Sequence, residues 1–169
     1  IGIAKLSGAE NIVVLGRRFN TKRGKKRRDV ALQMGACMVI DTEVSDWENG
    51  IKKDFPKIFD RIIVTSPPKT IPPILPIASF GGIIAFNGIS FLDENITFNA
   101  NSFHFNKLKL VSSHAIPNWG FPMAFQLLKR RIIDYKTVVT HKFKFSEIEQ
   151  AFQVASSIDE PVIKVMVTF

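Results

Sequence analysis

Cysteine and polar aromatic residues are scarce in this sequence of 169 residues, and its 15 acidic residues are outnumbered by 23 basic ones. The single cysteine, Cys37, cannot form an internal disulfide, and its position at the edge of an apolar run predicts a buried, reduced thiol. Fifteen phenylalanines stand against one tyrosine and two tryptophans. We therefore expect a core filled with aromatic rings that carry no hydrogen-bonding group.

Long apolar runs are also absent. No uninterrupted apolar stretch approaches the roughly 20 residues that a membrane-spanning helix needs. The first residues, IGIAKLSGAENIVVL, lack the order of charged and apolar segments that marks a signal peptide. We expect no membrane association and a cytoplasmic location, in a chain whose 46% apolar residues are ordinary for a globular protein.

Positive charge, by contrast, is plentiful and is concentrated in one segment. Residues 16–28 read GRRFNTKRGKKRR and contain eight of the 23 basic residues, while the remaining 15 basic residues equal the 15 acidic ones. The high isoelectric point is therefore a property of this segment. Its partner could be a nucleic acid, a membrane surface or a single phosphate of a cofactor.

Apolar runs and helical spacing alternate along the first half of the chain. Val30 and Met34 fall on one helical face before Gly35, and Trp47, Ile51 and Phe55 recur after the capping-box pattern Ser45 to Glu48. Strands are expected at residues 12–15, 37–41, 59–66 and 83–90. This alternation predicts an α/β fold with a parallel sheet flanked by helices.

The remaining segments are less regular. Residues 67–82, PPKTIPPILPIASFGG, predict a short or irregular helix that Pro76 disturbs and that ends at Gly81-Gly82. Residues 96–115 look extended, and helical spacing returns at 121–132. A second capping-box pattern at 146–149 predicts another helix, and residues 161–169 predict a final strand.

Several of these segments, taken in order, resemble the C-terminal part of the medium-chain dehydrogenase/reductase family, in its zinc-type alcohol and polyol dehydrogenase group. The segments are AKLSGAENIVVL (4–15), ALQMGACMVID (31–41), FDRIIVTS (59–66), FGGIIAFNGIS (80–90), VVTHKFKFSEIEQAF (138–152) and VIKVMVTF (162–169). The resemblance implies a Rossmann-like sheet. It places a partial dinucleotide-binding domain at residues 1–115 and a segment that returns to a catalytic domain at residues 116–169.

The resemblance also implies that a first strand and a G-x-G-x-x-G turn should precede this sequence, with residues 1–9 as the last turns of the following helix. Since that strand is normally central, two strands would lose their shared neighbour. Three explanations stay open: the chain is a fragment, another polypeptide supplies the strand, or residues 12–16 pair directly with 59–66.

The family's zinc ligands and proton relay would also lie upstream, so no catalytic or metal-binding residue is assigned here. Any zinc would belong to the absent catalytic domain. His104, His114 and His141 lack ligand-like spacing and are expected to be structural or surface residues.

The end of the second Rossmann strand faces the adenosine ribose, where arginine accommodates the extra 2′-phosphate of NADP. The sequence has Gly16, Arg17 and Arg18 there and no carboxylate. The planar guanidinium group of arginine can bind phosphate oxygens through two parallel hydrogen bonds, and Gly16 lets the backbone approach the ribose. NADP is therefore favoured over NAD. Residues 22–26 are expected to form a solvated loop, with a helix starting at Arg27.

The carboxyl ends of the other strands supply further candidate contacts, because ligands bind there in open α/β sheets. In the family these loops lie along the nicotinamide half of the cofactor, and a basic residue in the last strand lies near the pyrophosphate. The corresponding residues are Thr65, Ser66, Pro67, Asn87, Gly88, Ile89 and Lys164. Plain turn chemistry for Thr65 and Ser66, and an exposed edge position for Lys164, are the alternatives.

The function expected from the resemblance is the cofactor-binding part of an NAD(P)-dependent oxidoreductase acting on an alcohol, polyol or carbonyl compound. We expect this part to be inactive alone and the protein to be a homo-oligomer. One alternative is a nucleic-acid-binding module, which is disfavoured because the aromatic residues are not interleaved with the charges. The other is a non-catalytic oligomerisation domain that uses residues 96–110 as a sheet edge.

Overall fold

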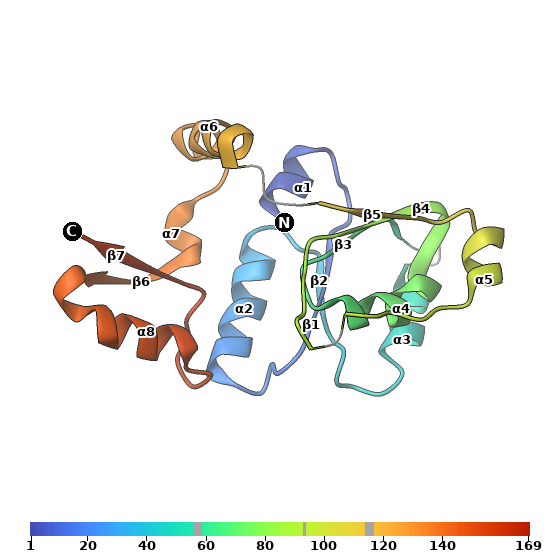
Figure 1. The fold of residues 1–169 in the computed structure, drawn as a ribbon, viewed down its shortest axis with the longest axis horizontal. Coiled ribbons are helices and arrows are strands. Elements are labelled where there is room, and N and C mark those ends of the chain that lie inside the picture. The colour runs from blue at the N-terminus through green and yellow to red at the C-terminus, as the bar shows by residue number, and fades with distance from the viewer. Residues whose placement is uncertain (56–58, 93, 114–116) are drawn as a thin grey trace. The chain divides into compact units, whose positions relative to one another are not determined.

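A computed structural model describes residues 1–55, 59–92, 94–113 and 117–169 (Figure 1). The chain divides into two compact units: unit 1 comprises residues 1–45 and 117–169, and unit 2 comprises residues 46–116. Every strand pair among the described residues is parallel. The predicted α/β class with parallel sheets flanked by helices is therefore confirmed. His114 and the predicted domain boundary between residues 115 and 116 lie outside the described residues.

Unit 1 opens with a helix followed by a βαβ unit. Its elements are α1 (Gly2–Leu6), β1 (Val13–Gly16), α2 (Lys22–Gln33) and β2 (Met38–Asp41). The two strands run parallel, from Val13 beside Met38 to Gly16 beside Asp41. Helix α2 buries Val30 and Ala31. Gly35, at a φ of +103°, follows the end of α2, as its position in the sequence predicted.

The basic segment is mostly helical, so the predicted solvated loop at residues 22–26 and the predicted helix start at Arg27 are wrong. Helix α2 begins at Lys22, and the Thr21 hydroxyl caps it by accepting a 3.0 Å hydrogen bond from the Gly24 N–H. Lysine and arginine have unbranched side chains that lose little freedom in a helix. With a cap at Thr21, these residues extend the helix instead of leaving a loop.

The C-terminal part of unit 1 is a second βαβ unit preceded by helices. Its elements are α6 (Pro117–Lys129), α7 (Tyr135–Val138), β6 (Val139–Lys144), η3 (Phe145–Glu147), α8 (Ile148–Ser156) and β7 (Lys164–Thr168). Strands β6 and β7 pair in parallel, and α8 packs against them and buries Ala151 (Figure 1). The predicted cap at Ser146 is wrong: Glu147 accepts the Lys144 N–H at 2.8 Å, so the turn begins earlier.

Unit 2 contains a three-stranded parallel sheet in the order β3-β4-β5. Its elements are α3 (Trp47–Asp54), β3 (Phe59–Val64), η1 (Pro68–Thr70), α4 (Ile71–Ile74), η2 (Leu75–Ile77), β4 (Ala78–Phe86), α5 (Ala100–Phe105) and β5 (Lys109–Ser112). The side chains that are fully buried in this unit belong to isoleucines, namely Ile51, Ile71, Ile77 and Ile84. As predicted, the proline-rich segment forms only short helical turns.

Three predicted boundaries in unit 2 are wrong. Helix α3 has no capping box, because Asp46 precedes it at a φ of +64° and makes no side-chain cap. Strand β4 begins at Ala78, before the glycine pair that was expected to end a helix. Residues 100–105 are helical and not extended, because the Asn99 side chain caps α5 by accepting the Ser102 N–H at 2.9 Å.

Strand β1 pairs with β2, and β3 pairs with β4. The direct pairing of residues 12–16 with 59–66 does not occur among the described strand pairs, so this alternative is wrong.

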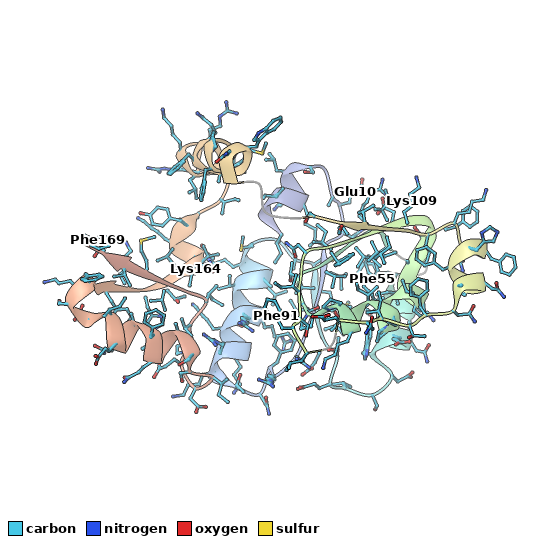
Figure 2. All side chains as sticks on the ribbon, viewed as in Figure 1. Glu10, Phe55, Phe91, Lys109, Lys164 and Phe169 are labelled. Carbon is cyan, nitrogen blue, oxygen red and sulfur yellow. The ribbon has the colours of Figure 1, made fainter. Side chains whose placement is uncertain are left out.

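Two expectations about the core are also wrong. Cys37 is exposed, and its thiol donates to the Ile12 carbonyl at 3.3 Å. The buried apolar residues of the described chain are isoleucine, valine and alanine, whereas many aromatic rings are exposed, including those of Phe91 and Phe169 (Figure 2). The wide exposure of the rings indicates that much of the apolar surface of these two units faces outward.

Candidate functional site

The carboxyl ends of β1 and β2 are tied together by three hydrogen bonds. The Thr42 N–H and hydroxyl both donate to the Gly16 carbonyl, at 2.8 and 3.1 Å. The Arg18 N–H donates to the Glu43 carboxylate at 3.0 Å. The turn that follows β1 therefore rests on the turn that follows β2.

The backbone of Arg18 is held from its other side by the start of α2. Arg18 has a φ of +62°, which is uncommon for a residue with a side chain. Its carbonyl accepts the Thr21 N–H at 3.1 Å and the Thr21 hydroxyl at 2.8 Å. A Cβ on Gly24 would lie 1.8 Å from that same carbonyl oxygen, so only glycine fits there. The conformation of Arg18 is thus fixed at both its N–H and its carbonyl.

A pocket of about 290 Å³ opens beside this turn and is lined largely by arginine. Its lining residues are Arg17, Arg18, Thr21, Arg23, Gly24, Arg27 and Ile158. The Arg23 N–H donates to the Ile158 carbonyl at 3.3 Å, and its guanidinium donates to the Ala155 carbonyl. These two bonds fix the first turn of α2 against the last turn of α8 and the segment that follows it.

The positive charge of this pocket is not neutralised by the described part of the chain. No carboxylate there lies within ion-pair distance of the four lining guanidinium groups. Burial, and next the charge of Arg27, lower the pKa of Arg23 below its ordinary value. The Arg23 Nε is buried and has no hydrogen-bond partner among the described residues. A bound anion would relieve the repulsion between these guanidinium groups.

Gly16, Arg17 and Arg18, which the sequence predicted as neighbours of a ligand, do lie at this edge of the β1–β2 sheet. Sequence reasoning missed two further arginines of the pocket, Arg23 and Arg27. Their spacing of four residues places them on one face of a helix once the cap at Thr21 is recognised. The signal was present, but the density of charge suggested a loop.

The candidate residues of unit 2 meet at the carboxyl ends of β3 and β4. Thr65, Ser66 and Pro67 follow β3, and Asn87, Gly88 and Ile89 follow β4. The Asn87 N–H donates to the Val64 carbonyl at 3.1 Å. A Cβ on Gly88 would lie 1.9 Å from the Ser66 carbonyl oxygen, so the two turns touch through their backbones. The Ser66 and Thr70 hydroxyl oxygens are 2.6 Å apart. The predicted role of these turns in cofactor binding stays a prediction.

Lys164 does not line the arginine pocket. It begins β7 beside Val139, and its side chain is exposed (Figure 2). Its assignment to a position near a pyrophosphate stays a prediction.

No three His, Cys, Asp or Glu side chains of the described chain lie close enough together to hold a metal ion, so none of them is assigned as a zinc ligand. His141 stacks on Phe143, with ring centroids 6.5 Å apart, and its Nδ1 lies 2.9 Å from the Thr140 hydroxyl. Within the same described ranges, no helix is long and apolar enough to cross a membrane.

The fold is similar to that of solved alcohol and polyol dehydrogenases. An alcohol dehydrogenase from E. coli CFT073, described as short-chain and solved with NADH, shares 20% identity at a TM-score of 0.85, over 99% of this chain and 48% of its own. 2R,3R-butanediol dehydrogenase from Bacillus subtilis shares 18% identity at a TM-score of 0.82, over 99% of this chain and 46% of its own. A protein from Sinorhizobium meliloti 1021, described as a zinc-binding dehydrogenase, is bound to NADP. It shares 19% identity at a TM-score of 0.81, over 100% of this chain and 48% of its own. The chain thus spans about half the length of each.

No curated protein matches the sequence of the chain. Residues 1–130, however, match the sequence family described as zinc-binding dehydrogenase. The similarities give no support to a nucleic-acid-binding or purely oligomerising module. The resemblance noted from the sequence is confirmed: the chain belongs to the zinc-binding dehydrogenase family.

Proposed function

We propose that this chain is the cofactor-binding part of an NAD(P)-dependent oxidoreductase that acts on alcohol, polyol or carbonyl compounds, and that it prefers NADP. The observation that carries the preference is the arginine pocket at the carboxyl ends of β1 and β2. Its four guanidinium groups have no carboxylate partner among the described residues. A phosphate monoester carries up to two negative charges and accepts several hydrogen bonds, which suits this pocket.

Each part of the pocket has a distinct role in this proposal. Arg17, Arg18 and Arg27 hold the oxygens of the 2′-phosphate, since guanidinium groups bind phosphate with two parallel bonds. Gly16 lets the backbone approach the adenosine ribose once the Phe19 ring, whose Cζ would lie 2.6 Å from a Cβ on Gly16, turns away. Arg23 contributes charge, while its bonds to the Ala155 and Ile158 carbonyls keep α2 in place.

The remaining predicted residues serve other parts of the cofactor. The turns at Thr65–Pro67 and Asn87–Ile89 contact the nicotinamide half through backbone groups, and Lys164 contacts the pyrophosphate. The cofactor itself supplies the hydride chemistry when it is bound. The chain's own residues bind and orient it. One solved neighbour holds NADH and another NADP, which supports a dinucleotide but not the choice between them.

The wider assignment rests on the family. Residues 1–115 would form the dinucleotide-binding part, and residues 116–169 would return to a catalytic domain. The protein would be a cytoplasmic homo-oligomer, and any zinc would bind outside this chain. Size-exclusion chromatography with light scattering on the full-length protein tests the oligomeric state.

The test of the cofactor preference uses the full-length protein and two variants. Isothermal titration calorimetry measures the affinities for NADP and NAD in the wild type, in Arg17→Asp and in Arg130→Asp. Arg130 is exposed and does not line the pocket, so it controls for the change in net charge. We expect the wild type to favour NADP, Arg17→Asp to lose that preference and Arg130→Asp to retain it. Equal affinities of the wild type for NADP and NAD would contradict the proposal.

A further inference from the structure

We infer that Glu43 tunes the cofactor selectivity of the arginine pocket by opposing a 2′-phosphate and accepting a hydrogen bond from an unmodified ribose hydroxyl. This inference rests on the proposed function. Glu43 belongs to the turn after β2, whereas the residues that the sequence placed at the ribose follow β1. It is a specificity-determining residue that only the three-dimensional contact brings to the site.

The position of the carboxylate is fixed from two directions. Glu43 Oε2 accepts the Arg18 N–H at 3.0 Å, and Arg18 lines the pocket. The Glu43 N–H donates to the Asp41 carboxylate at 2.9 Å. The bonds from Thr42 to Gly16 hold the intervening backbone. The carboxylate is therefore held at the turn of the arginines by backbone contacts, although Glu43 does not itself line the pocket.

The negative charge of Glu43 is not neutralised by a neighbouring cation of the described chain. No guanidinium or ammonium group of the described chain lies within ion-pair distance of it. Its other oxygen, Oε1, accepts no hydrogen bond from the described residues. A fixed carboxylate beside a phosphate site repels the bound dianion, while a free carboxylate oxygen is a good acceptor for a hydroxyl.

A purely structural role for Glu43 predicts a different pattern. If Glu43 acted only by holding Arg18, any side chain with an acceptor oxygen would serve equally well. Glutamine keeps that oxygen and removes the charge, so Glu43→Gln separates charge from position. Alanine removes both, so the difference between Glu43→Ala and Glu43→Gln reports the positional contribution.

The experiment compares two probes on the full-length protein. Adenosine 2′,5′-bisphosphate carries the 2′-phosphate, and adenosine 5′-monophosphate has a free 2′-hydroxyl. Calorimetry gives the affinity for each in the wild type, Glu43→Gln, Glu43→Ala and Glu10→Gln. Glu10 is an exposed residue before the amino end of β1, the end opposite the pocket, and it controls for net charge (Figure 2). Thermal unfolding checks that each variant is folded.

We expect Glu43→Gln to raise the affinity for the bisphosphate by about three- to tenfold, as the loss of one repulsive charge at a partly solvated site implies. The affinity for the monophosphate should fall or stay constant, and Glu10→Gln should change neither. Both probes should bind more weakly to Glu43→Ala than to Glu43→Gln, because only the alanine variant takes away the anchor of Arg18. If the wild type prefers the bisphosphate and Glu43→Gln leaves the ratio of the two affinities unchanged, the inference alone is overturned. No preference in the wild type would overturn the proposed function and this inference together.

Discussion

The carbonyl oxygen of Arg18 lies 1.8 Å from the point where a Cβ on Gly24 would stand. The first turn of α2 and the arginine turn after β1 are therefore in direct backbone contact, which only glycine permits. The same carbonyl accepts two hydrogen bonds from Thr21. The shape of the pocket thus depends on two small residues that carry no charge.

Replacement of Gly24 by alanine should damage both stability and phosphate binding. The methyl group cannot fit without displacing α2 or the Arg18 backbone, and such overpacking costs about 1–3 kcal/mol. Urea denaturation should show the loss in unfolding free energy, and calorimetry should show weaker binding of adenosine 2′,5′-bisphosphate.

Gly50→Ala is the matched control. Gly50 lies inside α3, where a Cβ would meet nothing within 4 Å. Alanine is favoured over glycine in a helix by about 0.5–1 kcal/mol. This variant should be as stable as the wild type or slightly more so. Equal effects of the two substitutions would contradict the packing described for Gly24.

Removal of the Thr21 hydroxyl should also loosen the pocket. Thr21→Ala loses the helix cap and the bond to the Arg18 carbonyl, which should cost about 1–2 kcal/mol of unfolding free energy. Thr21→Ser keeps the hydroxyl and should behave nearly like the wild type. Thermal unfolding measures both. If serine fails to rescue stability, the hydroxyl is not the stabilising group.

The contact between Gly88 and Ser66 leads to a corresponding prediction in unit 2. A Cβ on Gly88 would lie 1.9 Å from the Ser66 carbonyl oxygen, so Gly88→Ala should separate the turns after β3 and β4. The expected cost is about 1–3 kcal/mol. Gly120→Ala in α6, where nothing lies within 4 Å, is the control and should not lower the melting temperature.

Binding of a 2′-phosphate should strengthen as pH rises through about 6, where a phosphate monoester gains its second negative charge. Guanidinium groups are charged throughout this range as a general property of arginine, although burial lowers the pKa of Arg23. The direction of this pH dependence follows from the ligand alone, because the dianion is attracted more strongly than the monoanion. The ratio of affinities for adenosine 2′,5′-bisphosphate and 5′-monophosphate, measured between about pH 5 and pH 8, should therefore rise. A ratio that falls with pH would argue against a guanidinium site.

The fold class was predictable because short apolar runs such as 12–15 and 59–66, separated by helical spacing, are typical of parallel strands. Local boundaries were not predictable where one backbone conformation decides them. Asp46 takes a left-handed conformation, which removes the cap expected at Ser45. Lys22 to Arg28 joined a helix because Thr21 caps it, although their charge suggested a loop.

The candidate site was predictable only where it is local in sequence. Gly16, Arg17 and Arg18 follow the strand directly and were found. Arg27 required the correct helix start. Glu43 lies 25 residues from Arg18 and comes to it through the pairing of β1 with β2 and a hydrogen bond between two turns. No local sequence pattern predicts such a contact.

The central claim is that the arginine pocket holds the 2′-phosphate of NADP. Arg27 and Arg28 are neighbours on α2, but only Arg27 lines the pocket. The most direct measurement is the affinity of the full-length protein for adenosine 2′,5′-bisphosphate in Arg27→Gln and Arg28→Gln. The account predicts a loss of about tenfold for Arg27→Gln, as expected for a charge-assisted bond, and little change for Arg28→Gln. Equal losses in the two variants, or none in either, would contradict it.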